Sequence, residues 1–175
     1  DVYKRQADGI LLKVKACGLC GSDLRTCHSG HRNVVPPWIL DHEITGVVQE
    51  VGKEVQGYKV GDNLAVAPAV YCGKCHFCLR GEYDLCLNIK EIAQYWPGGF
   101  AQYMIIPREA LSLGNINFIP ENISFYQAAI SEPLSSCIKA QQIARVEMGD
   151  TVVIIGAGPI GCFHTEIAHS RGASK

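Results

Sequence analysis

Residues 72–86 read CGKCHFCLRGEYDLC, so four cysteines are separated by two, two and seven residues. Four thiolates can form a closed tetrahedral shell around a zinc ion, with Zn–S distances of ~2.3 Å. The short spacings allow turns to direct the sulfur atoms toward one point, and Gly73 relaxes the first turn. A closed shell leaves no position for a substrate. The pattern therefore predicts a structural zinc site, whose ligands are Cys72, Cys75, Cys78 and Cys86.

Two alternatives exist for this four-cysteine segment (residues 72–86). Four cysteines also hold iron–sulfur clusters, and four thiols can pair as two disulfides. We favour zinc, whose binding energy would order a segment that has little apolar core of its own. His76 lies inside the segment. Four thiolates suffice without it, so we expect His76 to be a solvated loop residue.

A second set of metal-binding residue types lies earlier in the chain, at Cys20 and at the pair His42-Glu43. Cys, His and Glu are ligands that catalytic zinc sites use, where three protein ligands leave one position open. One Cys and one His-Glu pair are common in proteins, so this pattern is weak alone. The four-cysteine segment increases its weight, and together they point to a chemically active site.

Composition limits the class of protein. The chain has 175 residues, is 47% hydrophobic and 19% charged, and carries a formal net charge of −1. This suits one globular domain, or one domain and part of another. The low net charge argues against binding to nucleic acid or anionic membranes. No apolar run approaches the ~18 residues of a membrane span, and no signal peptide is recognised. The metal-like spacing of the cysteines indicates a reducing, cytoplasmic setting.

The first six residues, Asp1–Gln6, have no hydrophobic pattern and no initiator Met. We interpret residues 1–6 as the translation of a sequencing adapter that does not belong to the native protein. The alternative is a genuine charged amino terminus. On the adapter interpretation, the chain is a fragment that is truncated at both ends.

Several short strands are predicted between Gly and Pro turns, which favours a barrel-like β domain. In the first of them, apolar residues alternate with Lys13 and Lys15, giving one buried and one solvated face. Ser124 can cap a short helix, and a longer helix is expected from Pro133 to about Arg145. The predicted strands span residues 10–16, 42–51, 64–67 and 100–106.

The end of the sequence carries a dinucleotide-binding pattern. A continuous apolar strand over residues 151–155 leads into Gly-x-Gly-x-x-Gly and a helix over residues 159–171. In this context the first glycine makes a tight turn, the second lets a pyrophosphate approach, and the third lets helix pack on strand. The anion would lie at the amino end of the helix. The residue that separates NAD from NADP is expected ~20 residues onward, so the preference stays open. The predicted cofactor-binding residues are Gly156, Gly158, Pro159, Ile160 and Gly161.

These motifs in this order resemble zinc-containing medium-chain dehydrogenases, most closely the polyol (sorbitol/L-iditol-like) and threonine dehydrogenase branch. The motifs are Cys20-Gly-Ser-Asp23, His42-Glu43, the four-cysteine segment, Glu132-Pro133 and Gly156–Gly161. The resemblance covers about residues 8–175. It implies a mainly β catalytic domain (a GroES-like barrel) with linking helices over residues 7–148. The first β-α unit of a Rossmann domain would follow over residues 149–175.

The resemblance also implies the ligands of the catalytic zinc. Cys20 and His42 would hold the ion, and Glu43 would be a direct ligand or swing in as one. Glu132 would bind directly or through a water molecule. With the four-cysteine segment, this makes two zinc ions per chain. The alternative for Glu132 is an exposed helix start.

Two further residues receive roles from the resemblance. Ser22 would hydrogen-bond the oxygen on the zinc and begin the proton exit. Asp23 would accept a hydrogen bond from the other ring nitrogen of His42 and fix its tautomer. The implied catalytic residues are thus Ser22, Asp23 and Glu43. Both Ser22 and Asp23 can also cap a helix, and the two roles are compatible.

The implied activity is hydride transfer between a secondary alcohol, polyol-like, and NAD or NADP. The complete enzyme would be a homo-oligomer, a tetramer or dimer, with a small-molecule substrate, and the fragment alone would be inactive. The alternative is a non-catalytic zinc-binding structural or interaction module.

Two residues depart from the family pattern. Asp41 stands in place of a Gly; Asp tolerates left-handed backbone better than most residues, and the alternative is a single-base read error. Arg25 stands where many relatives have a relay His.

Overall fold

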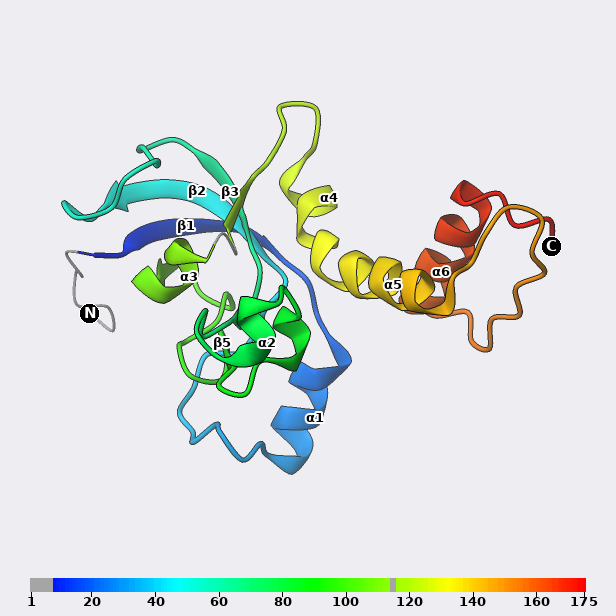
Figure 1. The fold of residues 1–175 in the computed structure, drawn as a ribbon. Coiled ribbons are helices and arrows are strands. Elements are labelled where there is room, and N and C mark those ends of the chain that lie inside the picture. The colour runs from blue at the N-terminus through cyan, green and yellow to red at the C-terminus, as the bar shows by residue number, and fades with distance from the viewer. Residues whose placement is uncertain (1–7, 114–115) are drawn as a thin grey trace. The chain divides into compact units, whose positions relative to one another are not determined.

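A computed structural model describes residues 8–113 and 116–175 (Figure 1). The predicted adapter, residues 1–6, lies outside the described residues. Contacts along the chain define two compact units, and the division falls between Ala129 and Ile130. The predicted division at residues 148 and 149 stays a prediction for the complete protein.

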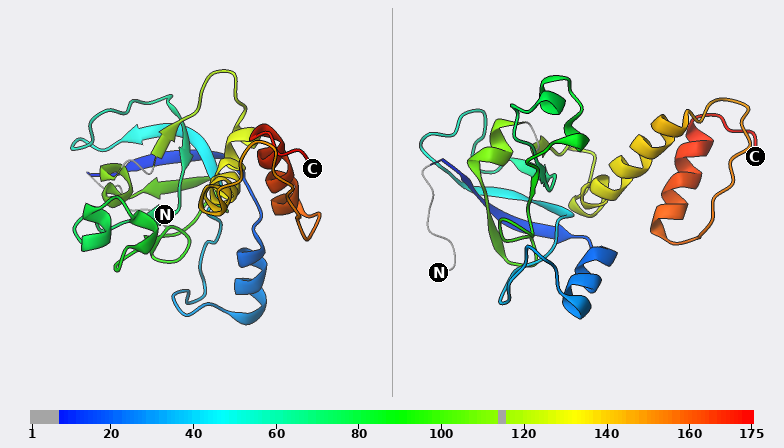
Figure 2. Two further views of the ribbon diagram at one scale, coloured as in Figure 1. Left: turned by 45° about the vertical axis from the view of Figure 1, so that its right-hand side comes forward. Right: turned by 60° about the horizontal axis from the view of Figure 1, so that its bottom comes forward.

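A five-stranded antiparallel sheet lies at the centre of the first unit, with the strand order β6-β1-β2-β3-β7. Figure 2 shows the two longest strands, β1 and β2, side by side. This arrangement confirms the mainly β fold that the sequence predicts. The strands are β1 Ile10–Cys17, β2 Ile44–Val51, β3 Asn63–Val66, β6 Tyr103–Ile106 and β7 Ile116–Phe118.

The core of this unit follows from alternation along the strands. In β1, Ile10 and Leu12 are fully buried, whereas Lys13 between Leu12 and Val14 is exposed. Alternate residues of a strand point to opposite faces, so one face collects the apolar side chains. Burial of each such side chain stabilises the fold by ~1.5–3 kcal/mol. The other core residues include Val48, Leu64, Val66, Met104 and Ile106.

Two strands begin later than predicted, because residues just before them form hydrogen bonds outside the sheet. β2 begins at Ile44 because the Glu43 N–H donates to the side chain of Asp41. β6 begins at Tyr103 because the preceding residues bond to another loop, with the Phe100 N–H donating to the Leu40 carbonyl. Both exceptions surround the same loop, which contains His42.

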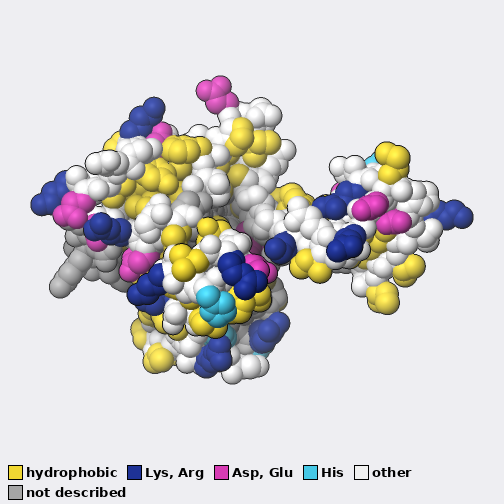
Figure 3. Space-filling view, viewed as in Figure 1, with side chains coloured by type: hydrophobic (Ala, Val, Ile, Leu, Met, Phe, Trp, Pro, Cys, Tyr) yellow, Lys and Arg dark blue, Asp and Glu magenta, His cyan; other side chains and the backbone are white. Residues whose placement is uncertain are grey.

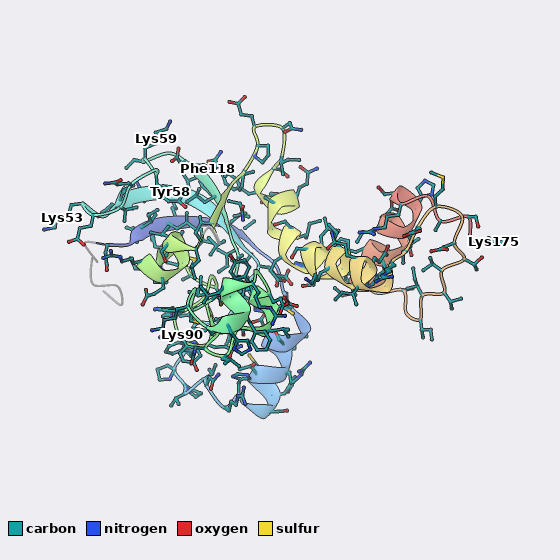
Figure 4. The ribbon with its side chains drawn as sticks, in the orientation of Figure 1. Lys53, Tyr58, Lys59, Lys90, Phe118 and Lys175 are labelled. Atoms are coloured by element: carbon teal, nitrogen blue, oxygen red, sulfur yellow. The ribbon has the colours of Figure 1, made fainter. Side chains whose placement is uncertain are left out.

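Short helices and a two-stranded ribbon complete the first unit. Ser124 caps α4 (Phe125–Ala129) as predicted, since its Oγ accepts the Gln127 N–H at 3.3 Å. At the sheet edge, the rings of Tyr58 and Phe118 stack with centroids 5.5 Å apart (Figure 4). The elements are α1 Gly21–Ser29, β4 Ala69–Val70, α2 His76–Leu79, a 3-10 helix Tyr83–Leu85, β5 Lys90–Glu91, α3 Arg108–Ser112 and α4 Phe125–Ala129.

The second unit consists of α5 (Ser131–Ala144) packed on α6 (Pro159–Ser170). Between these two helices, the Gln141 side-chain amide donates to the His164 carbonyl at 2.7 Å. Both helices occupy nearly the predicted residues. Where the two helices pack, Cys137 of α5 and Ala168 of α6 are buried.

The strand predicted over residues 151–155 is wrong for this structure, because the segment has no regular secondary structure. A sheet strand needs neighbouring strands to complete its hydrogen-bond ladder, and no strand among the described residues pairs with it. The side chains of Val153 and Ile155 are accordingly 83% and 98% exposed. Helix α6, which follows, forms as predicted.

Acidic and basic side chains are interspersed on the face of the first unit that Figure 3 shows. That face therefore has no broad region of one charge, in line with the low net charge.

Within residues 8–113 and 116–175, no helix is long and apolar enough to cross a membrane.

Candidate metal centres and cofactor site

The four-cysteine segment brings its sulfur atoms to one point. The four Sγ atoms all lie within 4.8 Å of one another. The Sγ of Cys78 lies 3.9 Å from that of Cys72 and 3.5 Å from that of Cys75. In a tetrahedron with arms of 2.3 Å, the edges are about 3.8 Å long. The sulfur atoms are thus spaced as ligands of one metal ion.

The local backbone explains this convergence. Gly73 has φ +68°, which gives the first turn its left-handed residue, as predicted. Cys75 is the N-cap of α2, Cys78 lies within α2, and Cys86 follows the 3-10 helix. The Cys75 N–H donates to the Sγ of Cys72 at 3.4 Å. The Cys72 N–H donates to the Sγ of Cys86 at 3.3 Å. His76 is exposed, as expected, but it is the first residue of α2 and not part of a loop.

These contacts divide the thiols into two kinds. Backbone N–H groups of Lys74 and Cys75 lower the pKa of Cys72 to about 6. Burial raises the pKa of Cys78 to about 12. Hydrogen bonds to a thiolate favour the charged form, whereas burial disfavours it. A metal ion is therefore needed to ionise the buried sulfur at neutral pH.

The disulfide alternative is wrong for this structure, because all nine cysteines, each in the described part of the chain, are free thiols. The spacing also favours a single ion over a cubane cluster. In such a cluster each thiolate binds a different iron atom, so the sulfur atoms lie further apart. The residues present fit one tetrahedral zinc ion.

A second group of ligand atoms belongs to Cys20, His42 and Glu43, which we call the mixed-ligand cluster. Their ligand atoms lie within 4.8 Å of one another. Cys20 and His42 are half-buried, and Glu43 is 7% exposed. Three donors of these types fit a zinc site that keeps a position open. The sequence pattern thus identified residues that do lie together, and their role as ligands stays a prediction.

Two chain segments supply the mixed-ligand cluster, and Asp23 joins them. Cys20 is the N-cap of α1, and the other two residues precede β2. Asp23 is 4% exposed, and its Oδ2 accepts the Cys20 N–H at 3.0 Å. Its Oδ1 accepts the Asp41 N–H at 3.2 Å. Asp23 therefore fixes the backbone on both sides of the cluster. Its predicted bond to the ring of His42 stays a prediction.

The carboxylate of Glu43 occupies space that Gly18 leaves open. A Cβ added at Gly18 would overlap Oε2 of Glu43. The Gly18 N–H also donates to the Glu43 carbonyl at 2.9 Å. A glycine is thus required here for close approach. The role of Gly18 was not predicted from the sequence, and its place two residues before Cys20 was the available signal.

The remaining predicted residues have different surroundings. Ser22 is half-buried in the first turn of α1, and Arg25 on the same helix is exposed. Glu132 lies half-buried in the first turn of α5, in the second unit. The roles of Ser22 and Glu132 at a metal therefore stay predictions.

The predicted dinucleotide turn has the expected backbone. Gly156 has φ +115°, Gly158 is the N-cap of α6, and Pro159 follows at the first helical position. A Cβ added at Gly161 would overlap the Gly156 carbonyl. The turn therefore packs tightly against the helix. Residues 156–160 are exposed, which leaves the amino end of the helix accessible to an anion. Binding of a dinucleotide stays a prediction.

Comparison with known proteins agrees with these features. The family model of the alcohol dehydrogenase GroES-like domain matches residues 6–115. The chain is 38% identical over 168 residues to D-arabitol-phosphate dehydrogenase of Enterococcus avium, covering 95% of this chain and 46% of that protein. It is 38% identical over 170 residues to sorbitol dehydrogenase of Bacillus subtilis, covering 95% and 47%.

Among solved structures, galactitol-1-phosphate dehydrogenase from Escherichia coli superposes with a TM-score of 0.87 at 31% identity, covering 99% of this chain and 48% of that one. The chain thus spans about half the length of the relatives it matches. The family match covers most of the first unit, including both groups of metal-binding residue types. The chain therefore belongs to the alcohol dehydrogenase GroES-like domain family.

Proposed function

We propose that the complete protein is a zinc-dependent dehydrogenase that transfers hydride between a secondary alcohol of polyol type and NAD or NADP. The observation that carries this proposal is the convergence of Cys20, His42 and Glu43 in a chain of this family. The names of its relatives include enzymes of sorbitol and of a polyol phosphate, which supports a polyol-like substrate.

In this proposal, the mixed-ligand cluster holds the catalytic ion. Bound zinc would supply Lewis acidity, lowering the pKa of an alcohol that approaches it. Cys20 and His42 would hold the ion, and Glu43 would be a direct ligand or swing in as one. Asp23 keeps the two ligand-bearing segments in place through the N–H groups of Cys20 and Asp41. Glu132 would join as a further ligand.

The proton of the alcohol needs an exit. Ser22 lies two residues after Cys20 and is half-buried, so its Oγ is our candidate to receive the proton and pass it to water. Arg25 is exposed, and a guanidinium offers hydrogen-bond donors but no acceptor, so it cannot replace a relay histidine. The proton path therefore runs through the serine hydroxyl and solvent.

The cofactor would bind at the Gly156–Gly161 turn. Its pyrophosphate would rest on the N–H groups at the start of α6, where the helix dipole favours an anion. Gly158 has no atom near its missing side chain, so a phosphate can approach the backbone closely. In the complete protein, the four-cysteine segment would hold a second, structural zinc. The cytoplasmic location and the homo-oligomeric state stay predictions.

Metal analysis and cofactor reduction test this proposal on the complete protein that contains this chain. We expect two zinc ions per chain and reduction of NAD or NADP with sorbitol, a sugar-alcohol phosphate or both. The Cys20→Ser variant should lose one zinc and the activity, while Cys27→Ser serves as the control. Two zinc ions with no reduction by any polyol or simple alcohol would instead support a non-catalytic zinc module.

A further inference from the structure

Asp41 is the least expected residue near the mixed-ligand cluster, because glycine is the residue that the family pattern expects there. It is fully buried and has φ +81°, a left-handed conformation in which Asp is more tolerable than most residues. A buried carboxylate is costly unless its oxygens are hydrogen-bonded. The contacts of this side chain therefore need an explanation.

One oxygen of Asp41 makes a contact that bears directly on a ligand. Oδ1 accepts the Glu43 N–H at 2.9 Å, two residues onward. Such a bond is an Asx turn, in which an Asp side chain replaces a backbone acceptor and fixes the turn. His42 lies between the two bonded residues, so the same turn sets the backbone of two members of the cluster.

The hydrogen bond from Glu43 to Asp41 and the two hydrogen bonds accepted by Asp23 form one continuous series. The Cys20 N–H donates to Asp23, the Asp41 N–H donates to Asp23, and the Glu43 N–H donates to Asp41. Two carboxylates thus alternate with three backbone N–H groups. This series of hydrogen bonds begins at Cys20 and ends at Glu43, which are both members of the mixed-ligand cluster.

The other oxygen is not held in the same way. Oδ2 of Asp41 is buried and makes no hydrogen bond of ordinary geometry, although the thiol of Cys17 lies beside this carboxyl group. A Cβ added at Gly99 would overlap this oxygen, and the Gly99 carbonyl accepts the thiol of Cys17 at 2.9 Å. The side chain of Asp41 therefore fits in this place because Gly99 has no side chain. Burying Oδ2 costs free energy, while Oδ1 of the same side chain orders a predicted ligand. A side chain that combines these two features is typical of a functional position.

We propose that Asp41 is a positioning residue that orders the mixed-ligand cluster for metal through its acceptor bond to the Glu43 N–H. This inference rests on the metal centre of the proposed function and adds a residue to it. The acceptor oxygen, rather than the charge, carries the role. An Asn at the same position retains that oxygen and also tolerates the left-handed backbone.

The test is cobalt binding by the complete protein that contains this chain, followed by its visible absorption and by competition with a chelator. The variants are Asp41→Gly, which removes the acceptor and suits φ +81°, and Asp41→Asn, which keeps it. The four-cysteine segment is an internal control, since its cobalt should bind equally in every variant that folds. Cys20→Ser defines the signal that belongs to the mixed-ligand cluster.

We expect Asp41→Gly to bind cobalt at the mixed-ligand cluster about 10- to 100-fold more weakly, the usual effect of losing a partner behind a ligand. Its ligand-field spectrum should also change, whereas Asp41→Asn should bind within about threefold of the parent chain. Parent-like affinity and spectrum in Asp41→Gly would overturn the inference. So would equal damage in both variants, because charge would then matter. If Cys20→Ser removed no cobalt signal, the metal centre itself would fail, which is a separate result.

Discussion

The four-cysteine segment and the mixed-ligand cluster both gather metal-ligand atoms within 4.8 Å, yet they are held in different ways. The first is local: its ligands lie within residues 72–86, and the N–H groups that contact the sulfur atoms belong to the segment itself. The second joins two distant segments through Asp23 and Asp41. A local shell can be closed by a metal alone, whereas the mixed-ligand cluster depends on surrounding carboxylates and glycines.

The largest expected effect comes from opening the closed shell. Replacing the buried Cys78 with Ser should abolish zinc binding at the four-cysteine segment and unfold the segment, because structural zinc contributes ~10–16 kcal/mol of apparent binding free energy. Limited proteolysis and metal analysis should show new cleavage within residues 72–90 and one zinc fewer per chain. Cys162→Ser, at an exposed cysteine on α6, is the control. Resistance to protease equal to the parent would refute the structural role.

The next effect concerns the mixed-ligand cluster alone. In Cys20→Ser, the second zinc should be lost while the four-cysteine segment keeps its own, since the two groups share no ligand. Thermal unfolding should show a smaller change than for Cys78→Ser, because the sheet does not rely on this ion. Metal analysis beside calorimetry measures both quantities. Loss of both ions would show that the two sites are not independent.

A finer comparison uses two glycines near the cluster. Gly18→Ala should place a Cβ against Oε2 of Glu43 and weaken zinc binding there about 10- to 100-fold. Gly21→Ala is the matched control, because a Cβ at Gly21 meets no atom within 4 Å. Chelator competition gives both affinities. Equal affinities in the two variants would show that Glu43 is not held as a ligand by this space.

The smallest effect is in the protons released when zinc binds to the four-cysteine segment. The pKa of Cys72 is lowered from 9.0 to about 6. The Cys72 thiolate therefore stabilises the folded segment. This stabilisation is complete above the pKa of the unfolded chain, 9.0, and is lost as the pH falls through the pKa of the folded segment, about 6. Zinc should release more protons at about pH 5 than at about pH 7.5, because the metal must then also displace the proton of Cys72. Titration of the Cys20→Ser chain isolates this site, and equal release at both pH values would contradict the shift.

The sequence predicted the local features well and the supporting contacts poorly. The spacing of four cysteines was sufficient to predict a convergent segment, because short turns leave few geometries. The grouping of Cys20 with His42 came from residue types and from family resemblance. The space made by Gly18 and the bond from the Asp41 N–H to Asp23 could not be predicted, since both depend on how distant segments pack.

The strand expected over residues 151–155 shows that an apolar pattern alone does not predict a strand. Its apolar pattern is that of a buried strand, but hydrogen bonds to neighbouring strands, rather than the pattern itself, create a strand. Helix α6 formed as predicted because its hydrogen bonds lie within the segment, with Pro159 in its first position. Elements with local hydrogen bonds were thus the ones that sequence reasoning located best.

Anomalous scattering at the zinc edge, from crystals of the metal-loaded 175-residue chain, tests most directly whether two differently built metal pockets exist. We predict two peaks per chain, one among the four sulfur atoms of residues 72–86 and one in contact with Cys20 and His42. A single peak, or a second peak away from those two side chains, would contradict this account.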